Sequence, residues 1–233
     1  DLVGGLEGVA RAKGELVEAL PASGAAILNA DDDRVAAMSS RTGASVLTYG
    51  WTGEVFPADI ELDVSARAHF FVHSPWGRAE VTLPVPGMHM VSNALAALAV
   101  AGTVGVDIDA AAAALADVEV SGMRMEVVMA PGGATVVNDA YNANPTSMHA
   151  ALDALAAFDA SRRNAVLGLK AEIEHPEVAH REVIRRAEDL GLEVLVVGTD
   201  LYGVEPVDDV RAAIGPLGPD AAVLVKASRS AGL

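Results

Sequence analysis

The turn Asn138-Asp139-Ala140-Tyr141-Asn142-Ala143-Asn144-Pro145 decides how the rest of the chain is interpreted. The β-branched residues 135–137 before it predict a strand, and apolar residues at helical spacing over 146–158 predict a helix after it. Asn144 suits the cap of that helix and Pro145 its first turn. Turn geometry needs one or two Asn or Asp side chains, whereas residues 138–144 contain four, together with a tyrosine. Ligands bind beyond the carboxyl ends of strands in open α/β sheets. We therefore predict a binding loop, with a capped turn that carries spare polar groups as the alternative.

The composition indicates a globular α/β protein. The chain has 233 residues, of which 52% are apolar and only 4% aromatic, so its core is built from Ala, Val and Leu. A net charge of −16 argues against nucleic acid or an anionic membrane as a partner. The absence of cysteine excludes disulfides and thiolate metal sites and fits a reducing cytosol. No signal-peptide pattern opens the sequence, and the Ala-rich run at 93–106 is too short to span a bilayer. We predict a soluble cytoplasmic protein.

The first 121 residues predict a mixed sheet. Strands expected at 25–29 and 45–50 alternate with helices at 5–20 and 34–40. Residues 55–83 then follow an alternating pattern of apolar and polar residues, which predicts an antiparallel excursion with a turn at Ser74-Pro75-Trp76-Gly77. Helices expected at 91–104 and 107–116 close this half.

The second half predicts a Rossmann-like domain. After a strand that starts at Gly122, strands and helices alternate at the spacing of parallel βαβ units. Strands are expected at 135–137, 163–168, 193–198 and 221–225, with helices at 146–158, 176–191 and 207–214 between them. We therefore predict an α/β chain with two domains, residues 1–121 and 122–233.

Three segments resemble the Mur ligase family. The sequence NDAYNANPTSM at 138–148, followed by an Ala/Leu-rich helix, is similar to the signature loop of its D-alanyl-D-alanine-adding members. A second match is Gly87-x-His89-x-x-x-Asn93, although Met90 stands where relatives often have Asn. Residues 226–229 read Lys-Ala-Ser-Arg where the family usually has Lys-Gly-Ser-Arg, and residues 168–174 depart clearly from it. The resemblance covers essentially the whole chain. It implies the latter part of a central ATP-binding domain followed by a Rossmann-like C-terminal domain.

The resemblance also implies roles for individual residues. In such enzymes a lysine in the context of Lys13 is carbamylated and helps to hold Mg²⁺, since the carbamate is a hard oxygen ligand. An arginine in the position of Arg124 lies near the ATP phosphates, which suits its fork of donors. The expected nucleotide contacts are His89, Asn93, Arg124 and Asp139, with Asn93 on the adenine and Asp139 on the ribose. The expected substrate contacts are Tyr141, Asn142, Asn144, Lys226, Ser228 and Arg229. Lys13 and Arg124 are the catalytic candidates.

Taken without the resemblance, several of these residues have simpler interpretations. Lys13 is then a solvated helix lysine that pairs with Glu18 or Glu7. His89 is then a cap at a helix start, and Arg124 a linker arginine that pairs with Glu126.

The function that the resemblance implies is amide-bond formation driven by ATP with Mg²⁺. The carboxylate of UDP-MurNAc-tripeptide is phosphorylated, and the amine of D-Ala-D-Ala attacks the acyl phosphate. We expect a monomer with small-molecule substrates and no nucleic-acid or membrane partner. No G-x-x-x-x-G-K-[ST] motif occurs, so the chain matches only part of such an enzyme and by itself is expected to be inactive. The alternatives are a related Mur-type ligase with another amine substrate and a non-catalytic nucleotide-binding protein of this fold.

Overall fold

The computed structural model describes residues 4–169 and 176–231. Contacts divide the chain into two compact units. Unit 1 comprises 1–61, 68–84 and 89–118, and unit 2 comprises 62–67, 85–88 and 119–233. The family departure predicted at 168–174 lies mostly outside the described residues. Within the described residues, no helix is both long enough and apolar enough to cross a membrane.

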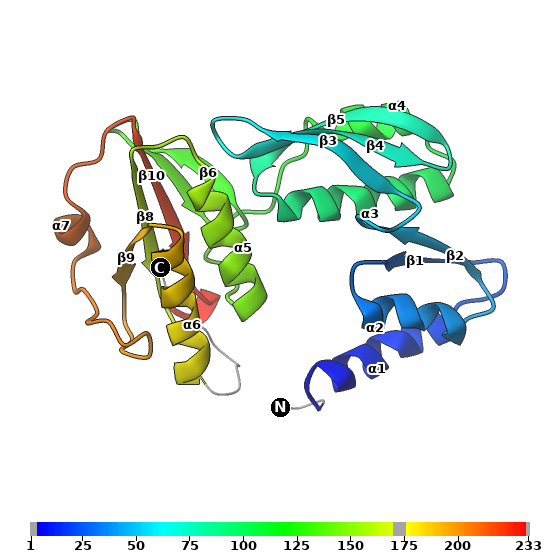
Figure 1. Cartoon of the computed structure of the whole chain (residues 1–233), viewed down its shortest axis with the longest axis horizontal. Helices are drawn as coiled ribbons and strands as arrows, with labels where there is room; N and C mark the ends of the chain where they lie inside the picture. Colours follow the sequence, from blue (N-terminus) through cyan, green and yellow to red (C-terminus); the bar gives the residue numbers. More distant parts are fainter. Residues whose placement is uncertain (1–3, 170–175, 232–233) are drawn as a thin grey trace. The chain divides into compact units, whose positions relative to one another are not determined.

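Unit 1 contains two small sheets with helices packed on them (Figure 1). Strands β1 and β2 pair in parallel, with Ala25 opposite Ser45, and the other sheet has the order β3-β4-β5. The elements run α1 (Gly5–Glu18), β1 (Ala25–Asn29), α2 (Asp33–Ala36), η1 (Ala37–Arg41), β2 (Ser45–Tyr49), β3 (Phe56–Leu62), β4 (Arg67–Ser74), β5 (Gly77–Pro86), α3 (His89–Thr103) and α4 (Ile108–Leu115).

The alternating pattern of residues 55–83 produces the core of this unit. Alternate side chains of β4 and β5, such as Phe70 and Val81, point to one face and are fully buried. They pack against Leu95 and Leu98 of α3 and against α4. The predicted antiparallel excursion therefore becomes a half-covered sheet whose second face stays accessible, as the alternation requires.

Unit 2 is a five-stranded sheet of order β6-β7-β10-β8-β9. Strands β7, β10, β8 and β9 are parallel, and β6 is antiparallel to β7. The α/β fold class predicted from the sequence is thereby confirmed. The elements run β6 (Glu126–Met129), β7 (Thr135–Asn138), α5 (Pro145–Ala156), β8 (Arg162–Leu167), α6 (Pro176–Asp189), β9 (Glu193–Val196), α7 (Val210–Ile214), β10 (Ala221–Lys226) and η2 (Arg229–Ala231).

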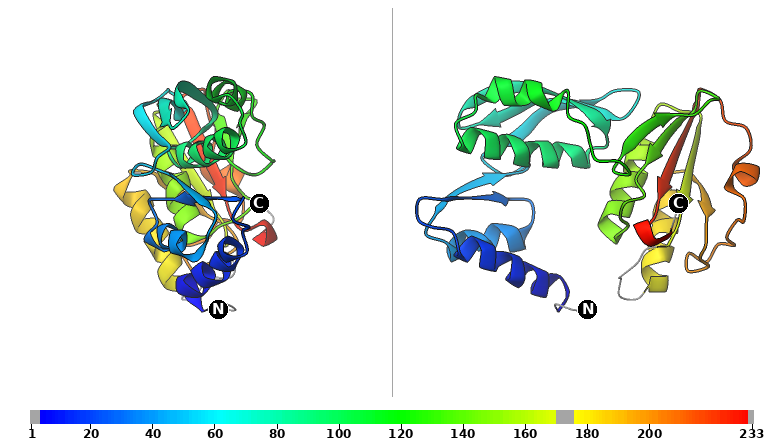
Figure 2. Two further views of the ribbon diagram at one scale, coloured as in Figure 1. Left: turned by 90° about the vertical axis from the view of Figure 1, so that its right-hand side faces the viewer. Right: turned by 180° about the vertical axis from the view of Figure 1, so that it is seen from behind.

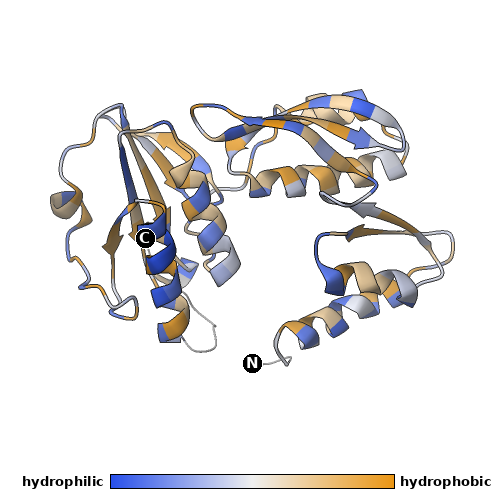
Figure 3. Cartoon of the chain, in the orientation of Figure 1, coloured by the Kyte–Doolittle hydropathy of each residue, from blue (hydrophilic) through white to orange (hydrophobic). Residues whose placement is uncertain are grey.

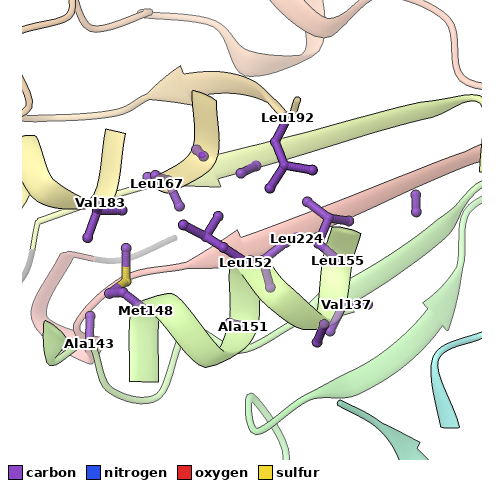
Figure 4. Close-up of a cluster of buried hydrophobic side chains, with 14 of the residues drawn as sticks. Val137, Ala143, Met148, Ala151, Leu152, Leu155, Leu167, Val183, Leu192 and Leu224 are labelled. Carbon is purple, nitrogen blue, oxygen red and sulfur yellow. The ribbon is translucent and has the colours of Figure 1, made fainter. Parts of the chain in front are cut away.

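Both faces of the unit 2 sheet are covered, as parallel sheets require. Helices α5 and α6 lie side by side on one face (Figures 1 and 2). Figure 4 shows Leu152 and Leu155 of α5 beside Leu224 of β10, in a cluster that also contains Leu167 of β8. On the other face Ile214 of α7 packs with side chains of β8 and β10. Figure 3 shows α6 as hydrophilic along most of its length, while the strands behind it are hydrophobic over much of theirs.

The strand predicted from Gly122 begins only at Glu126. Met123 and Met125 have φ values of 62° and 52°, which is left-handed backbone that a methionine rarely adopts. Such residues cannot continue an extended strand, so residues 123–125 form a tight turn. The Glu126 carboxylate supports this turn by accepting a hydrogen bond from the Met123 N–H at 3.0 Å.

Candidate functional site

The carboxyl ends of β7, β10 and β8 meet at one edge of the unit 2 sheet. Past these ends, backbone hydrogen bonds still join the segments: Asp139 N–H donates to Val225 O at 2.9 Å and Gly168 N–H to Lys226 O at 3.0 Å. The parallel pairing of the three strands places residues 139–144 and 226–229 at this edge. It is the edge at which open α/β sheets bind ligands.

Lys226 lies at the centre of this edge and is fully buried. Its ammonium donates to Asp139 Oδ2 at 2.5 Å, to Asn142 O at 2.9 Å and to Asp139 O at 3.4 Å. An ammonium has three protons, so these bonds account for all of its donors. The ammonium of Lys226, which was predicted to contact the substrate, therefore already uses its donors within the protein.

Asp139 joins three segments of unit 2. One carboxylate oxygen receives the Lys226 ammonium, and the other accepts the Met125 N–H at 3.1 Å. The side chain keeps 16% of its surface exposed. Because each carboxylate oxygen carries two acceptor sites, both retain capacity for a hydroxyl donor from a ligand. This arrangement suits the ribose contact predicted for Asp139.

Arg124 and Tyr141 form a stacked pair at the same loop. The guanidinium carbon lies 4.0 Å from the ring centroid, and the Tyr141 N–H donates to Met123 O at 3.0 Å. Stacking uses the face of the guanidinium plane, while its N–H donors project from the edges. The ion pair with Glu126, the alternative for Arg124, does not form among the described residues.

The amides of the loop mainly stabilise the loop itself. Asn144 Oδ1 accepts the Ser147 N–H at 2.8 Å, and Ser147 Oγ accepts the Asn144 N–H at 3.1 Å. This capping box confirms the predicted helix start. Asn142 Oδ1 accepts the Ala143 N–H at 2.8 Å, and Asn138 Oδ1 accepts the Ala140 N–H at 3.3 Å. The capped-turn alternative thus explains these amide oxygens, but it leaves Asp139 and Tyr141 without a role in the cap.

Ser228 and Arg229 follow β10 at the same edge. Ser228 is buried, with 6% of its surface exposed, and its N–H donates to Leu169 O at 2.9 Å. Arg229 opens η2 and is exposed. Of the three candidates at 226–229, Arg229 therefore offers the accessible head group.

The remaining candidates belong to unit 1. Lys13 is exposed in the middle of α1, and Glu18, one of its expected partners, accepts a hydrogen bond from Arg41 Nε at 2.8 Å. His89 is the first residue of α3, and the exposed Asn93 follows one turn later. The Asn93 side-chain amide lies 3.5 Å from Met90 Sδ. No group of three or more His, Cys, Asp or Glu side chains within the described residues is placed to hold a metal ion.

A buried tyrosine that the sequence pattern did not single out supports the end of β8. The Tyr202 hydroxyl donates to Gly168 O at 2.8 Å, and its ring meets His180 edge-on at 4.6 Å between centroids. Burial raises the pKa of the Tyr202 phenol above its usual value. Tyr202 therefore stays neutral and holds the backbone just after β8. No local motif marks it, because the contact spans 34 positions.

Family models match both halves of the chain. Residues 1–101 match the Mur ligase middle domain. Residues 123–231 match the Mur ligase, glutamate ligase domain. The second match contains the whole strand-end edge described above.

Individual relatives agree with these models. The chain is 40% identical to a UDP-N-acetylmuramoyl-tripeptide--D-alanyl-D-alanine ligase of Mycobacterium bovis, over 99% of this chain and 53% of that protein. A crystal structure of MurF from Acinetobacter baumannii is 28% identical with a TM-score of 0.87, and it covers 98% of this chain and 54% of its own. A MurF ligase of Thermotoga maritima in complex with ADP shares the fold, with a TM-score of 0.86 at 22% identity, over 99% of this chain and 56% of its own. The chain thus spans about half the length of the relatives it matches.

Proposed function

We propose that this chain, which belongs to the Mur ligase family, serves an ATP-dependent ligase that joins D-alanyl-D-alanine to UDP-N-acetylmuramoyl-tripeptide. The observation that carries the proposal is 40% identity to relatives of that name across 99% of this chain. The loop after β7 supports the proposal, because it contains Asp139 and Tyr141, which the capped turn does not need.

The proposed reaction activates a carboxylate and then forms an amide. ATP transfers its terminal phosphoryl group to the tripeptide carboxylate and gives an acyl phosphate and ADP. The amine of D-alanyl-D-alanine attacks the acyl carbon, and the tetrahedral intermediate expels phosphate. The chain's own contribution is positioning and charge neutralisation, which dominate phosphoryl transfer.

Each residue at the strand-end edge has a separate role in positioning the nucleotide or neutralising its charge. Asp139 accepts a ribose hydroxyl with the acceptor capacity that Lys226 and Met125 leave unused. Arg124, stacked on Tyr141, offers the edge of its guanidinium plane to the phosphates, for which a planar fork of donors is suited. In unit 1, Asn93 contacts the adenine and His89 opens the same helix beside it.

The proposal includes Mg²⁺, with Lys13 as one of the residues that would hold it. The exposed ammonium of Lys13 is accessible for carbamylation, and the carbamate would supply the hard oxygen ligand that Mg²⁺ prefers. When bound, the ion would neutralise the phosphate charge during transfer.

The remaining proposals concern the substrates and the protein's organisation. We place Tyr141, Asn142, Asn144, Ser228 and Arg229 on the side toward the peptide substrates; all of them are exposed except the buried Ser228. The chain consists of two domains, residues 1–121 and 122–233. The protein acts as a monomer in the cytoplasm.

The test is product formation by the full-length protein. It is incubated with ATP, Mg²⁺ and one pair of acceptor and amine at a time: UDP-N-acetylmuramoyl-tripeptide with D-alanyl-D-alanine, UDP-N-acetylmuramoyl-L-alanyl-D-glutamate with 2,6-diaminopimelate, or UDP-N-acetylmuramate with alanine. Mass spectrometry follows the product, and ADP release is measured in parallel. We expect product and ADP only with D-alanyl-D-alanine. Product from another pair would reassign the protein to a different ligase of the family, and neither product nor ADP from any pair would indicate a non-catalytic protein.

A further inference from the structure

We propose that Lys226 is a positioning residue, which holds the Asp139 carboxylate in the orientation that receives the ribose of the nucleotide. The proposal rests on the proposed function for the identity of the ligand. It replaces the substrate contact expected for Lys226 with a role inside the protein.

The geometry of the ammonium carries the proposal. Lys226 ends β10, which lies between β7 and β8, so its side chain reaches the loop after β7 from the neighbouring strand. It donates to the Asp139 carboxylate and to two carbonyls, Asp139 O and Asn142 O. One head group thus fixes both the side chain of Asp139 and the backbone on either side of Tyr141.

The burial of Lys226 makes this arrangement rigid. Lys226 exposes none of its surface to solvent, and a buried charge that loses its partner is strongly unfavourable. The Asp139 carboxylate therefore cannot rotate away from Lys226 at low cost. Its second oxygen is held in turn by the Met125 N–H, so both ends of the carboxylate are tethered while 16% of the side chain still faces solvent.

Lysine suits this position better than arginine. Its three donors radiate from one nitrogen and reach three acceptors that belong to two residues. A planar guanidinium would need more room and directs its donors into a fork. Methionine has a similar length and no donor, so Lys226→Met removes the hydrogen bonds while largely keeping the buried volume.

The first experiment measures ribose discrimination in the full-length ligase. kcat/KM is determined with ATP and with 2′,3′-dideoxy-ATP for the wild type, Lys226→Met, Asp139→Ala and the double variant. Arg186→Met is the matched control, because it removes another cation from unit 2 that pairs with an acid, Asp153, at 2.6 Å.

We expect the wild type and Arg186→Met to prefer ATP by about tenfold or more, the scale of a hydrogen bond to a charged group. In Lys226→Met and in Asp139→Ala, the ratio of kcat/KM for ATP to kcat/KM for 2′,3′-dideoxy-ATP should fall close to one. The double variant should show the same ratio as the single variants. A Lys226→Met enzyme that is slower but keeps the wild-type preference would overturn the proposal, since its defect would then be only structural.

A second experiment separates this proposal from the proposed function. Amide hydrogen exchange of Met125 and Tyr141 is compared in the wild type, Lys226→Met and Arg186→Met. We expect about tenfold faster exchange at both amides in Lys226→Met alone. Unchanged exchange would overturn the positioning role even in an active ligase. Faster exchange in a protein without ligase activity would refute the proposed function and leave the tether between Lys226 and Asp139 in place.

A third measurement applies if Lys226→Met does not fold. In the wild-type protein labelled with ¹⁵N at the lysine side chains, the Lys226 ammonium is assigned by its loss in Lys226→Arg. We expect its protons to exchange slowly with water and its signal to shift when an ATP analogue binds. Exchange as fast as that of a fully solvated lysine ammonium, such as that of free lysine, would contradict the proposal.

Discussion

The Arg124 guanidinium carbon lies 4.0 Å from the centroid of the Tyr141 ring, which couples the turn before β6 to the loop after β7. Arg124 stands between two methionines with left-handed backbone, so the turn itself leaves its side chain exposed. The Tyr141 ring, 40% exposed, supplies the surface on which the guanidinium rests. Within the described parts of the chain the Arg124 guanidinium forms no ion pair with an acid, so its N–H donors are available to a phosphate.

Replacing Tyr141 should weaken ATP use through Arg124. An exposed cation–π contact contributes about 0.5–1 kcal/mol, so we expect Tyr141→Leu to raise KM for ATP by roughly two- to fivefold in the full-length enzyme. Tyr141→Phe keeps the ring and should leave KM for ATP close to the wild-type value. Equal KM values in the Leu and Phe variants would show that the stack does not position Arg124.

Replacing Asn144 should mainly lower the stability of the folded protein. Its capping box predicts that Asn144→Ala lowers the free energy of unfolding by about 1 kcal/mol, measured by urea denaturation. Asn144→Asp keeps a good cap and should stay near the wild type. If both variants are stable but inactive, Asn144 acts on the substrate; if Asn144→Asp restores stability and activity together, the cap is its main role.

Tyr202 should make the protein sensitive to alkaline pH. Burial raises its pKa in the folded state, while the unfolded tyrosine titrates at about 10. The stabilisation from the neutral phenol is therefore complete below about pH 10 and is lost as the pH rises further. Tyr202→Phe should cost about 1 kcal/mol at neutral pH through the lost bond to Gly168 O. Above pH 10, urea titrations should show a smaller difference between the free energies of unfolding of the wild type and Tyr202→Phe. A difference in unfolding free energy that stays constant across this pH range would refute the prediction.

The two proposed domains should respond separately to core mutations. Leu152 and Leu95 are fully buried in the cores of units 2 and 1. Leu152→Ala and Leu95→Ala should each cost about 2–5 kcal/mol. In calorimetry each variant should lower a different thermal transition. A single transition that both variants shift equally would mean that residues 1–121 and 122–233 unfold as one unit.

Local patterns were sufficient to predict most elements. The strand at Ala25–Asn29 has the predicted bounds, and Pro145 and Asn144 mark the start of α5 because proline and a capping amide have fixed places there. The α/β class followed from strands and helices that alternate along the sequence. The turn at Met123–Met125 could not be predicted, because methionine gives no signal for left-handed backbone.

The candidate site was only partly predictable. The loop at 138–145 is visible in the sequence because its polar residues are contiguous. The contact between Lys226 and Asp139 spans 87 positions and depends on β10 lying between β7 and β8, which no local pattern encodes. The sequence therefore indicates which residues are unusual, while the strand order decides that Lys226 faces Asp139.

The most direct test of the nucleotide-binding loop is a calorimetric titration of a non-hydrolysable ATP analogue with Mg²⁺ into the full-length protein. Three forms are compared: the wild type, Asp139→Ala and Asp153→Ala, an exposed aspartate of the same unit as the control. We predict that Asp139→Ala weakens binding by about tenfold or more, as expected for a lost bond to a charged acceptor, and that Asp153→Ala binds as the wild type does. Wild-type affinity in Asp139→Ala would contradict the assignment and place the nucleotide elsewhere.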